Sequence, residues 1–273
     1  MFDLLRDLFS YAFIVRAMVV GILVALCAAL LGVTLVLKRY SMLGDGLSHV
    51  GFGTLAIAMS LHLAPLEVSI PVVLLAAFCL LRISESSKIK GDAAIALISS
   101  SALAIGVVVI SMTTGMNTDV CNYMFGSILA MSKSDVMLSM AVAVVVLVLY
   151  VFSYNRIFSV TFDESFAKAT GMKVARYNML IAFLTAMVIV VGMRMMGAML
   201  ISSLVIFPAL TSMRVFSSFK RVVLCSAVLS VACFFIGLTA SFALSTPTGA
   251  SVVLVNLAAF CLFSAAAKLG IKA

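Results

Sequence analysis

Long apolar runs, each close to the length of a membrane span and separated by short polar connections, dominate this sequence. Of its 273 residues, 64% are hydrophobic and only 10% are charged, a balance that soluble domains do not show. A helix needs about 20 apolar residues to cross the hydrocarbon core of a bilayer. The pattern therefore predicts an all-α, polytopic transmembrane bundle of about eight or nine helices, with residues 1–273 forming a single domain embedded in membrane lipid.

The expected spans follow from the apolar segments and from the distribution of basic residues between them. Placing the loop at 38–42 in the cytoplasm puts 14 of the 18 Lys and Arg residues into cytoplasmic loops, as such loops favour. We therefore expect the N-terminus outside and the C-terminus in the cytoplasm. No basic run with interleaved aromatic residues accompanies the net charge of +8, so we expect no nucleic-acid partner. The expected spans are 17–37, 43–61, 65–82, 93–113, 136–154, 177–193, 196–213, 222–243 and 250–267.

One predicted span carries an acid and an imidazole. Asp45 and His49 stand four residues apart in the stretch SMLGDGLSHVGFG, so a helix places them on one face. Ionisable groups at membrane depth are costly and mark functional sites, and the interspersed glycines let a neighbouring backbone approach closely. A carboxylate with an imidazole suits a divalent cation that must later be released. The imidazole favours zinc and the carboxylate favours manganese, so the pair leaves both ions open.

The long connection at 155–176 has a pattern of its own. Thr161 is a candidate helix N-cap with Glu164 three residues later, and Gly171 is a candidate stop. We expect a short amphipathic helix of about two turns lying parallel to the membrane. A docking element for another protein is the favoured interpretation, and a simple interfacial helix is the alternative.

Two other segments carry expectations. The stretch from Thr113 to Lys133 contains an apolar piece too short to span, so an external hairpin or a re-entrant helix is expected there. His62 is expected to be a solvated residue of the outer interface and Arg194 a lone interfacial anchor. Pro208 is expected to kink its helix. The sequence contains no Gly-Lys dipeptide and hence no P-loop, so any ATPase must be a separate subunit.

Several motifs, in order along nearly the whole chain, resemble one family. The chain is similar to the membrane permease subunit of bacterial ATP-binding-cassette importers for zinc, manganese or iron(II), with the fold of the type II importers. The combination of motifs is specific, although each motif alone is weak. The motifs are KRYSMLGDGLSHVGFG (38–53), GDAAIAL (91–97), NYMFGSILA (122–130), TFDESFAKATGMKV (161–174), MGAMLISSLVIFPAL (196–210) and TPTGASVVLV (246–255).

The resemblance implies partners and site residues. It implies two copies of the chain, each bound to a cytoplasmic ATPase, and an extracytoplasmic metal-binding protein that delivers the ion. It implies that the metal pathway includes Asp45, His49 and, on the outer side, Asp119. Asp92 also matches an acidic position of the family, with helix N-capping as an equally good interpretation. The residues implied for coupling to the ATPase are Asp163, Glu164, Phe166, Ala167 and Gly171.

These expectations together predict a transport subunit and not an enzyme. Zinc is the first expected substrate, manganese and iron(II) are alternatives within the family, and an ATP-independent secondary carrier is a further one. No permanently bound cofactor is expected, because the metal is transported and ATP binds the partner subunit.

Overall fold

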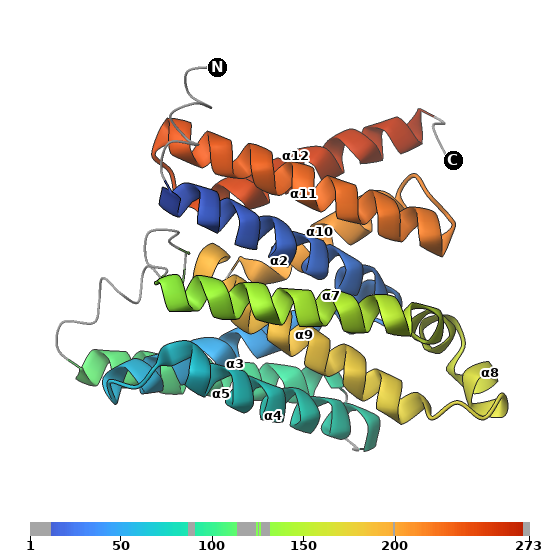
Figure 1. Cartoon of the computed structure of the whole chain (residues 1–273). Helices are drawn as coiled ribbons and strands as arrows, with labels where there is room; N and C mark the ends of the chain where they lie inside the picture. The colour runs from blue at the N-terminus through green and yellow to red at the C-terminus, as the bar shows by residue number, and fades with distance from the viewer. Residues whose placement is uncertain are drawn as a thin grey trace.

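The computed structural model describes residues 12–86, 91–113, 132–198 and 200–269, together with positions 124 and 126. These residues form helices joined by short turns, in agreement with the predicted all-α class (Figure 1). The expected entry residue Asp119 and most of the 113–133 segment lie outside the described residues. The helices are α2 (Ala12–Leu37), α3 (Ser41–Ser60), α4 (Pro65–Ser86), α5 (Gly91–Met112), α7 (Lys133–Phe162), α8 (Glu164–Ala169), α9 (Val174–Met196), α10 (Ile201–Met213), α11 (Phe219–Leu244) and α12 (Thr248–Lys268).

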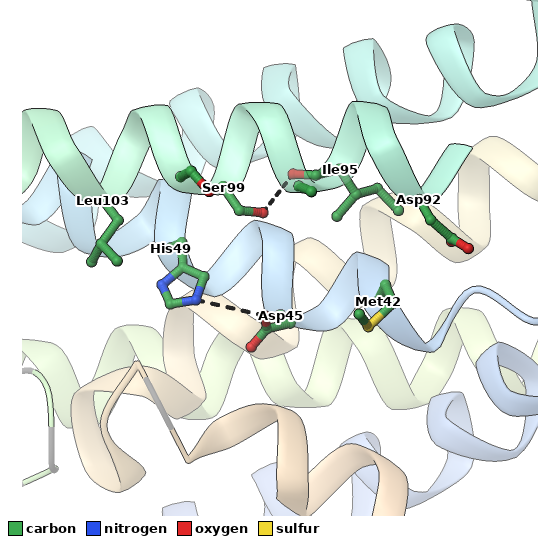
Figure 2. Close-up of a pocket in the computed structure, with 9 residues that line it drawn as sticks. Met42, Asp45, His49, Asp92, Ile95, Ser99 and Leu103 are labelled. Atoms are coloured by element: carbon green, nitrogen blue, oxygen red, sulfur yellow. Dashed lines mark hydrogen bonds and ion pairs between the residues drawn. The ribbon is translucent and has the colours of Figure 1, made fainter. Parts of the chain in front are cut away.

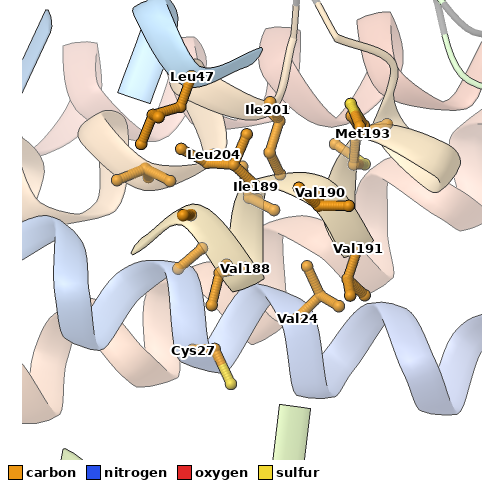
Figure 3. Packing of buried hydrophobic residues seen from close by; sticks show 14 of the residues in the cluster. Val24, Cys27, Leu47, Val188, Ile189, Val190, Val191, Met193, Ile201 and Leu204 are labelled. Atoms are coloured by element: carbon orange, nitrogen blue, oxygen red, sulfur yellow. The ribbon is translucent and has the colours of Figure 1, made fainter. Parts of the chain in front are cut away.

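The core of the bundle lies around α2 and α9. Helix α2 packs against α7, α10 and α11, while α9 packs against α4, α7 and α3. Val24 of α2 lies beside Val191 of α9 at this centre (Figure 3), whereas the Cys27 thiol donates to the Ala143 carbonyl of α7 at 3.4 Å. Cys27 is 1% exposed, so its side chain packs as a small apolar group in this core. The short α8 lies at the end of the bundle where α7 ends and α9 begins (Figure 1).

The exterior of the bundle is apolar, as a lipid-facing surface requires. Seven of the described helices are long and apolar enough to cross a membrane, and α3 and α10 are not among them. Helix α3 carries several glycines together with Asp45 and His49, and α10 has 13 residues. On α7 the outward side chains include Val151 and Phe152, which are 67% and 86% exposed. These features define a multi-pass membrane protein.

The predicted span at 196–213 is divided differently in the structure. Helix α9 continues to Met196, and Gly197 then takes a positive φ of 86°. Glycine tolerates this conformation because it has no Cβ. Helix α10 begins at Ile201 and is too short to span a bilayer alone. The helix therefore breaks at Gly197 and begins again at Ile201, within one largely apolar stretch of the sequence.

Thr161 does not cap the short helix, and this expectation was wrong. Helix α7 extends through Phe162, so the Thr161 hydroxyl lies within it and donates to the Ile157 carbonyl. The cap of α8 is Asp163, whose Oδ1 accepts from the Phe166 N–H at 2.9 Å. Buried Ile157 and Val160 hold the end of α7 against the bundle. This packing explains why the helix continues past residue 154, where the predicted span ends.

Arg194 is not a lone interfacial anchor. Its guanidinium forms an ion pair with Asp135, and the two side chains are 6% and 15% exposed. Asp135 also accepts from the Ser132 N–H in a capping box at the start of α7. The pair therefore ties the beginning of α7 to the end of α9, next to the break at Gly197.

Replacing Arg194 by Met should destabilise the protein by about 3 kcal/mol, because the buried carboxylate of Asp135 loses its counter-ion. Unfolding of the purified protein in detergent would measure this. The exposed Arg221 of α11 is the matched control, and Arg221→Met should stay within about 0.5 kcal/mol of wild type. Equal stability of the Arg194→Met protein and wild type would contradict a structural role for the pair.

Candidate metal-transport site

A tight turn between α2 and α3 positions the candidate site. Arg39 takes a positive φ of 59°, the Arg39 N–H donates to the Val36 carbonyl, and the Tyr40 N–H donates to the Leu35 carbonyl at 2.8 Å. This is the hydrogen-bond pattern of a Schellman C-cap. Helix α3 begins directly afterwards at Ser41. The turn therefore sets where the second turn of α3, which carries Asp45, lies relative to α2.

Asp45 and His49 lie on one face of α3, as their spacing predicts. The His49 Nε2 and the Asp45 Oδ2 are 3.6 Å apart, and their side chains are 18% and 48% exposed. This distance is longer than a hydrogen bond. The two groups therefore form a long polar contact, and the carboxylate keeps further lone pairs that a cation could share.

The pair opens onto a pocket between α3 and α5 of about 220 Å³ (Figure 2). Asp92 in the first turn of α5 lines the same pocket. It does not complete a ligand set, because the described residues contain no group of three or more His, Cys, Asp or Glu side chains that could hold a metal ion. The remaining lining residues are Met42, Ile95, Ala96, Ser99, Ser100 and Leu103.

One polar contact of the site was not predicted from the sequence. Ser202 at the start of α10 places its Oγ 3.4 Å from the Asp45 Oδ1. The motif ISSLVIF offers two serines without indicating which of them faces α3. The contact brings the segment after the Gly197 break to the candidate metal pair.

Glycines on α3 bring α5 close to the pair. A Cβ at Gly53 would lie 2.5 Å from the carbonyl oxygen of Ala102, and a Cβ at Gly46 would lie 2.7 Å from the Ile95 side chain. Such distances exclude any side chain without a shift of α5. The close packing that the glycine pattern predicts is therefore present, and Ile95, which lies against Gly46, lines the pocket.

The short helix α8 presents an exposed aromatic residue at the end of the bundle. Phe166 is 63% exposed, while Ala167 is buried against Val160 and Val174. Gly171 has a φ of 82° and ends the helix, as predicted from its position. Helix α8 is thus fixed on one side and open on the other.

Glu164 at the start of α8 is held in its ionised form. Partial burial raises the pKa of its carboxyl, but the ammonium of Lys38 and the amide of Asn178 outweigh this effect. The net result is a pKa below the ordinary value, so the carboxylate stays charged at neutral pH.

The chain's other histidine lies elsewhere. His62 is exposed in the turn after α3 and has a positive φ of 55°. This agrees with the expected solvated residue, and the structure does not bring it to Asp45 and His49 in the pocket.

A multi-pass helical bundle with an ionisable pair facing a pocket is typical of a membrane transport protein of the permease class. The sequence profile of the ABC 3 transport family matches residues 10–267, and the chain belongs to this family. The resemblance drawn from the sequence motifs is confirmed.

Relatives and one solved structure extend over nearly the whole chain. The manganese import system permease protein ScaB of Streptococcus gordonii is 30% identical, covering 94% of this chain and 92% of the relative. The high-affinity zinc uptake system membrane protein ZnuB of Haemophilus influenzae is 27% identical, covering 90% and 94%. The structure of PsaBC from Streptococcus pneumoniae in complex with Fab matches with a TM-score of 0.87 and 30% identity, covering 98% of this chain and 99% of that chain.

Replacing Gly53 by Ala should destabilise the protein by about 1–3 kcal/mol, because the new methyl group collides with the Ala102 carbonyl. Thermal unfolding in detergent would measure the loss.

Gly44 on the same helix is the matched control. A Cβ there meets one atom of Ile189 at 3.9 Å, which is ordinary contact. Gly44→Ala should leave the stability unchanged or raise it by about 0.5–1 kcal/mol, since alanine favours helix. If the two variants unfold at the same temperature, Gly53 does not set the approach of α5.

Proposed function

We propose that this chain is the permease subunit of an ATP-driven importer for divalent transition metal ions, with zinc as the first substrate to test. The observation that supports this most is the pair Asp45 and His49, 3.6 Å apart and facing a pocket. An acid and an imidazole held at a long distance from each other beside a pocket are a costly arrangement in a membrane protein, and ion transport explains it.

The ligand chemistry leaves the ion open within one class. Carboxylate and imidazole together accept zinc, manganese or iron(II). Relatives of this chain are named for manganese, zinc and iron transport, so their names do not favour zinc over the others. Zinc remains our first candidate because of the imidazole, and manganese and iron(II) are the alternatives.

The pair alone supplies too few donors for a tightly held ion. Zinc takes four ligands in its stable sites, whereas Asp45 and His49 supply two. We propose that a second copy of the chain contributes an equivalent pair, and that Asp119 belongs to the outer entry. A site of this mixed kind binds weakly enough to release its ion.

The source of energy is proposed to be a separate ATPase that docks on α8. The sequence has no P-loop, and α8 offers the exposed Phe166 beside the capped turn of Asp163. An exposed aromatic residue on a fixed helix is a common anchor of protein interfaces. The proposed docking segment comprises 155–176, with Asp163, Glu164, Phe166, Ala167 and Gly171 as its coupling residues.

The remaining parts of the proposal concern topology and delivery. The end of the bundle that carries α8 is assigned to the cytoplasm, with the N-terminus outside and the C-terminus inside, because the basic loops gather there. A metal-binding protein outside the membrane delivers the ion. Residues 1–273 form one domain in a bacterial plasma membrane.

Replacing His49 by Ala should lower ATP-dependent metal uptake at least tenfold, because half of the donor pair is lost. The measurement is uptake of zinc and of manganese into proteoliposomes that contain the permease, its ATPase and the delivery protein. Asp45→Ala should have the same effect.

His62→Asn is the control, since asparagine tolerates the positive φ at that position and His62 lies outside the pocket. It should transport at the wild-type rate. Full uptake by assembled His49→Ala importer would refute the site, and uptake without ATP would favour a secondary carrier. Transport of manganese alone would keep the mechanism and change the substrate.

Replacing Asp163 by Ala should weaken capture of the ATPase by the permease. The loss of an N-cap costs about 1 kcal/mol, enough to loosen a helix as short as α8. Co-purification of the ATPase with a tagged permease would measure it. Thr161→Ala is the control, because that hydroxyl bonds within α7, and it should retain wild-type capture. The reverse ranking of the two variants would restore Thr161 as the cap.

A further inference from the structure

Lys38, the residue after α2, is a buried cation whose three N–H groups all have acceptors. Its side chain is 4% exposed. The Nζ lies 2.6 Å from the Glu164 Oε1, 2.7 Å from the Asn178 Oδ1 and 3.2 Å from the Val160 carbonyl oxygen. An ammonium has three donors, so this set saturates it. The acceptors belong to three different helices: α7, α8 and α9.

The acceptors are themselves joined. The Asn178 Nδ2 donates to the Glu164 Oε1 at 3.2 Å, which closes a triangle of three side chains. Asn178 is 4% exposed, so the amide is held by the bundle. Around Lys38, the aromatic ring of Tyr40 lies 5.7 Å from the ammonium. A buried charge bound in this way is costly to displace.

Lys38 also connects α8 to the turn between α2 and α3. Helix α8 is attached to α7 and α9 by the apolar cluster of Val160, Ala167 and Val174, and Lys38 adds an attachment to the turn between α2 and α3. That turn is closed by the Arg39 and Tyr40 backbone hydrogen bonds. It leads without a spacer into Ser41, the first residue of α3, and Asp45 follows one turn later.

We propose that Lys38 is a positioning residue that links α8 to the start of α3, so that a displacement of α8 moves Asp45 and His49. This inference rests on the proposed function, in which α8 is the docking site of the ATPase. The link is short: one ion pair, one hydrogen-bonded turn and the first turns of a helix. Lys38 touches no transported ion and acts through the helix that carries the pair.

Amide hydrogen exchange of the full-length permease in detergent tests the link without transport. Lys38→Met keeps the length of the side chain but removes its charge and donors. Exchange should become at least tenfold faster in 41–47, while 164–169 should stay within about twofold of wild type, because the Asp163 cap and the contacts of Ala167 with Val160 and Val174 still hold α8. Lys220→Met, at an exposed lysine near the start of α11, is the matched control and should exchange at wild-type rates in both segments. Unchanged exchange in 41–47 of the Lys38→Met protein would overturn the proposal.

Transport by the reconstituted importer gives the second readout. Lys38→Met should keep ATPase capture and hydrolyse ATP within about twofold of wild type, while metal uptake per ATP falls at least fivefold. A parallel loss of hydrolysis and uptake would assign Lys38 to docking alone and overturn the link. An unchanged ratio would overturn it as well.

Two further comparisons keep the test decisive. If Lys38→Met does not fold, Glu164→Gln preserves the shape of the acceptor and removes its charge, and it should raise exchange in 41–47 at least threefold. No change there would overturn the link. A wild-type importer without ATP-driven metal uptake would refute the proposed function, while the exchange experiment would still decide whether Lys38 connects the two segments.

Discussion

Charged groups inside an apolar bundle must find their partners within the protein, because lipid offers none. Arg194 pairs with Asp135, and Lys38 is saturated by three oxygens. Asp45 and His49 differ, since they stand 3.6 Å apart beside a pocket. The two closed arrangements hold helices together, and the open one keeps ligand atoms available. This contrast, more than hydrophobicity, distinguishes the candidate site from the scaffold that carries it.

The closed arrangements lie at opposite ends of the helices that surround the site. The Arg194 pair fixes the junction of α9 and α10, from which Ser202 reaches Asp45. The Lys38 cluster fixes the beginning of α3, which carries Asp45 itself. The position of the Asp45 carboxylate thus depends on two distant polar arrangements, the Arg194–Asp135 pair and the Lys38 cluster. In the proposed metal pathway, Asp45 would thus respond to events at both ends of the bundle.

The sequence predicts those features that depend on local periodicity. The apolar segments give the long helices, four-residue spacing places Asp45 with His49, and Gly171 ends α8 where expected. Arg194 and Asp135 are far apart in the chain, so no local pattern connects them. The cap of α8 was predicted wrongly because Thr161 and Asp163 are both competent acceptors. The choice between them follows from the packing of Ile157 and Val160, which carries α7 past Thr161.

The contact between Gly53 and the Ala102 carbonyl has a consequence for motion. Where a helix backbone touches its neighbour without intervening side chains, the two cannot slide past each other without a collision. Helices α3 and α5 are therefore packed backbone to backbone at this contact. In the proposed transport cycle, access to Asp45 and His49 would then change through movement of the segment that faces these two helices, namely the break at Gly197 and the Ser202 that follows it.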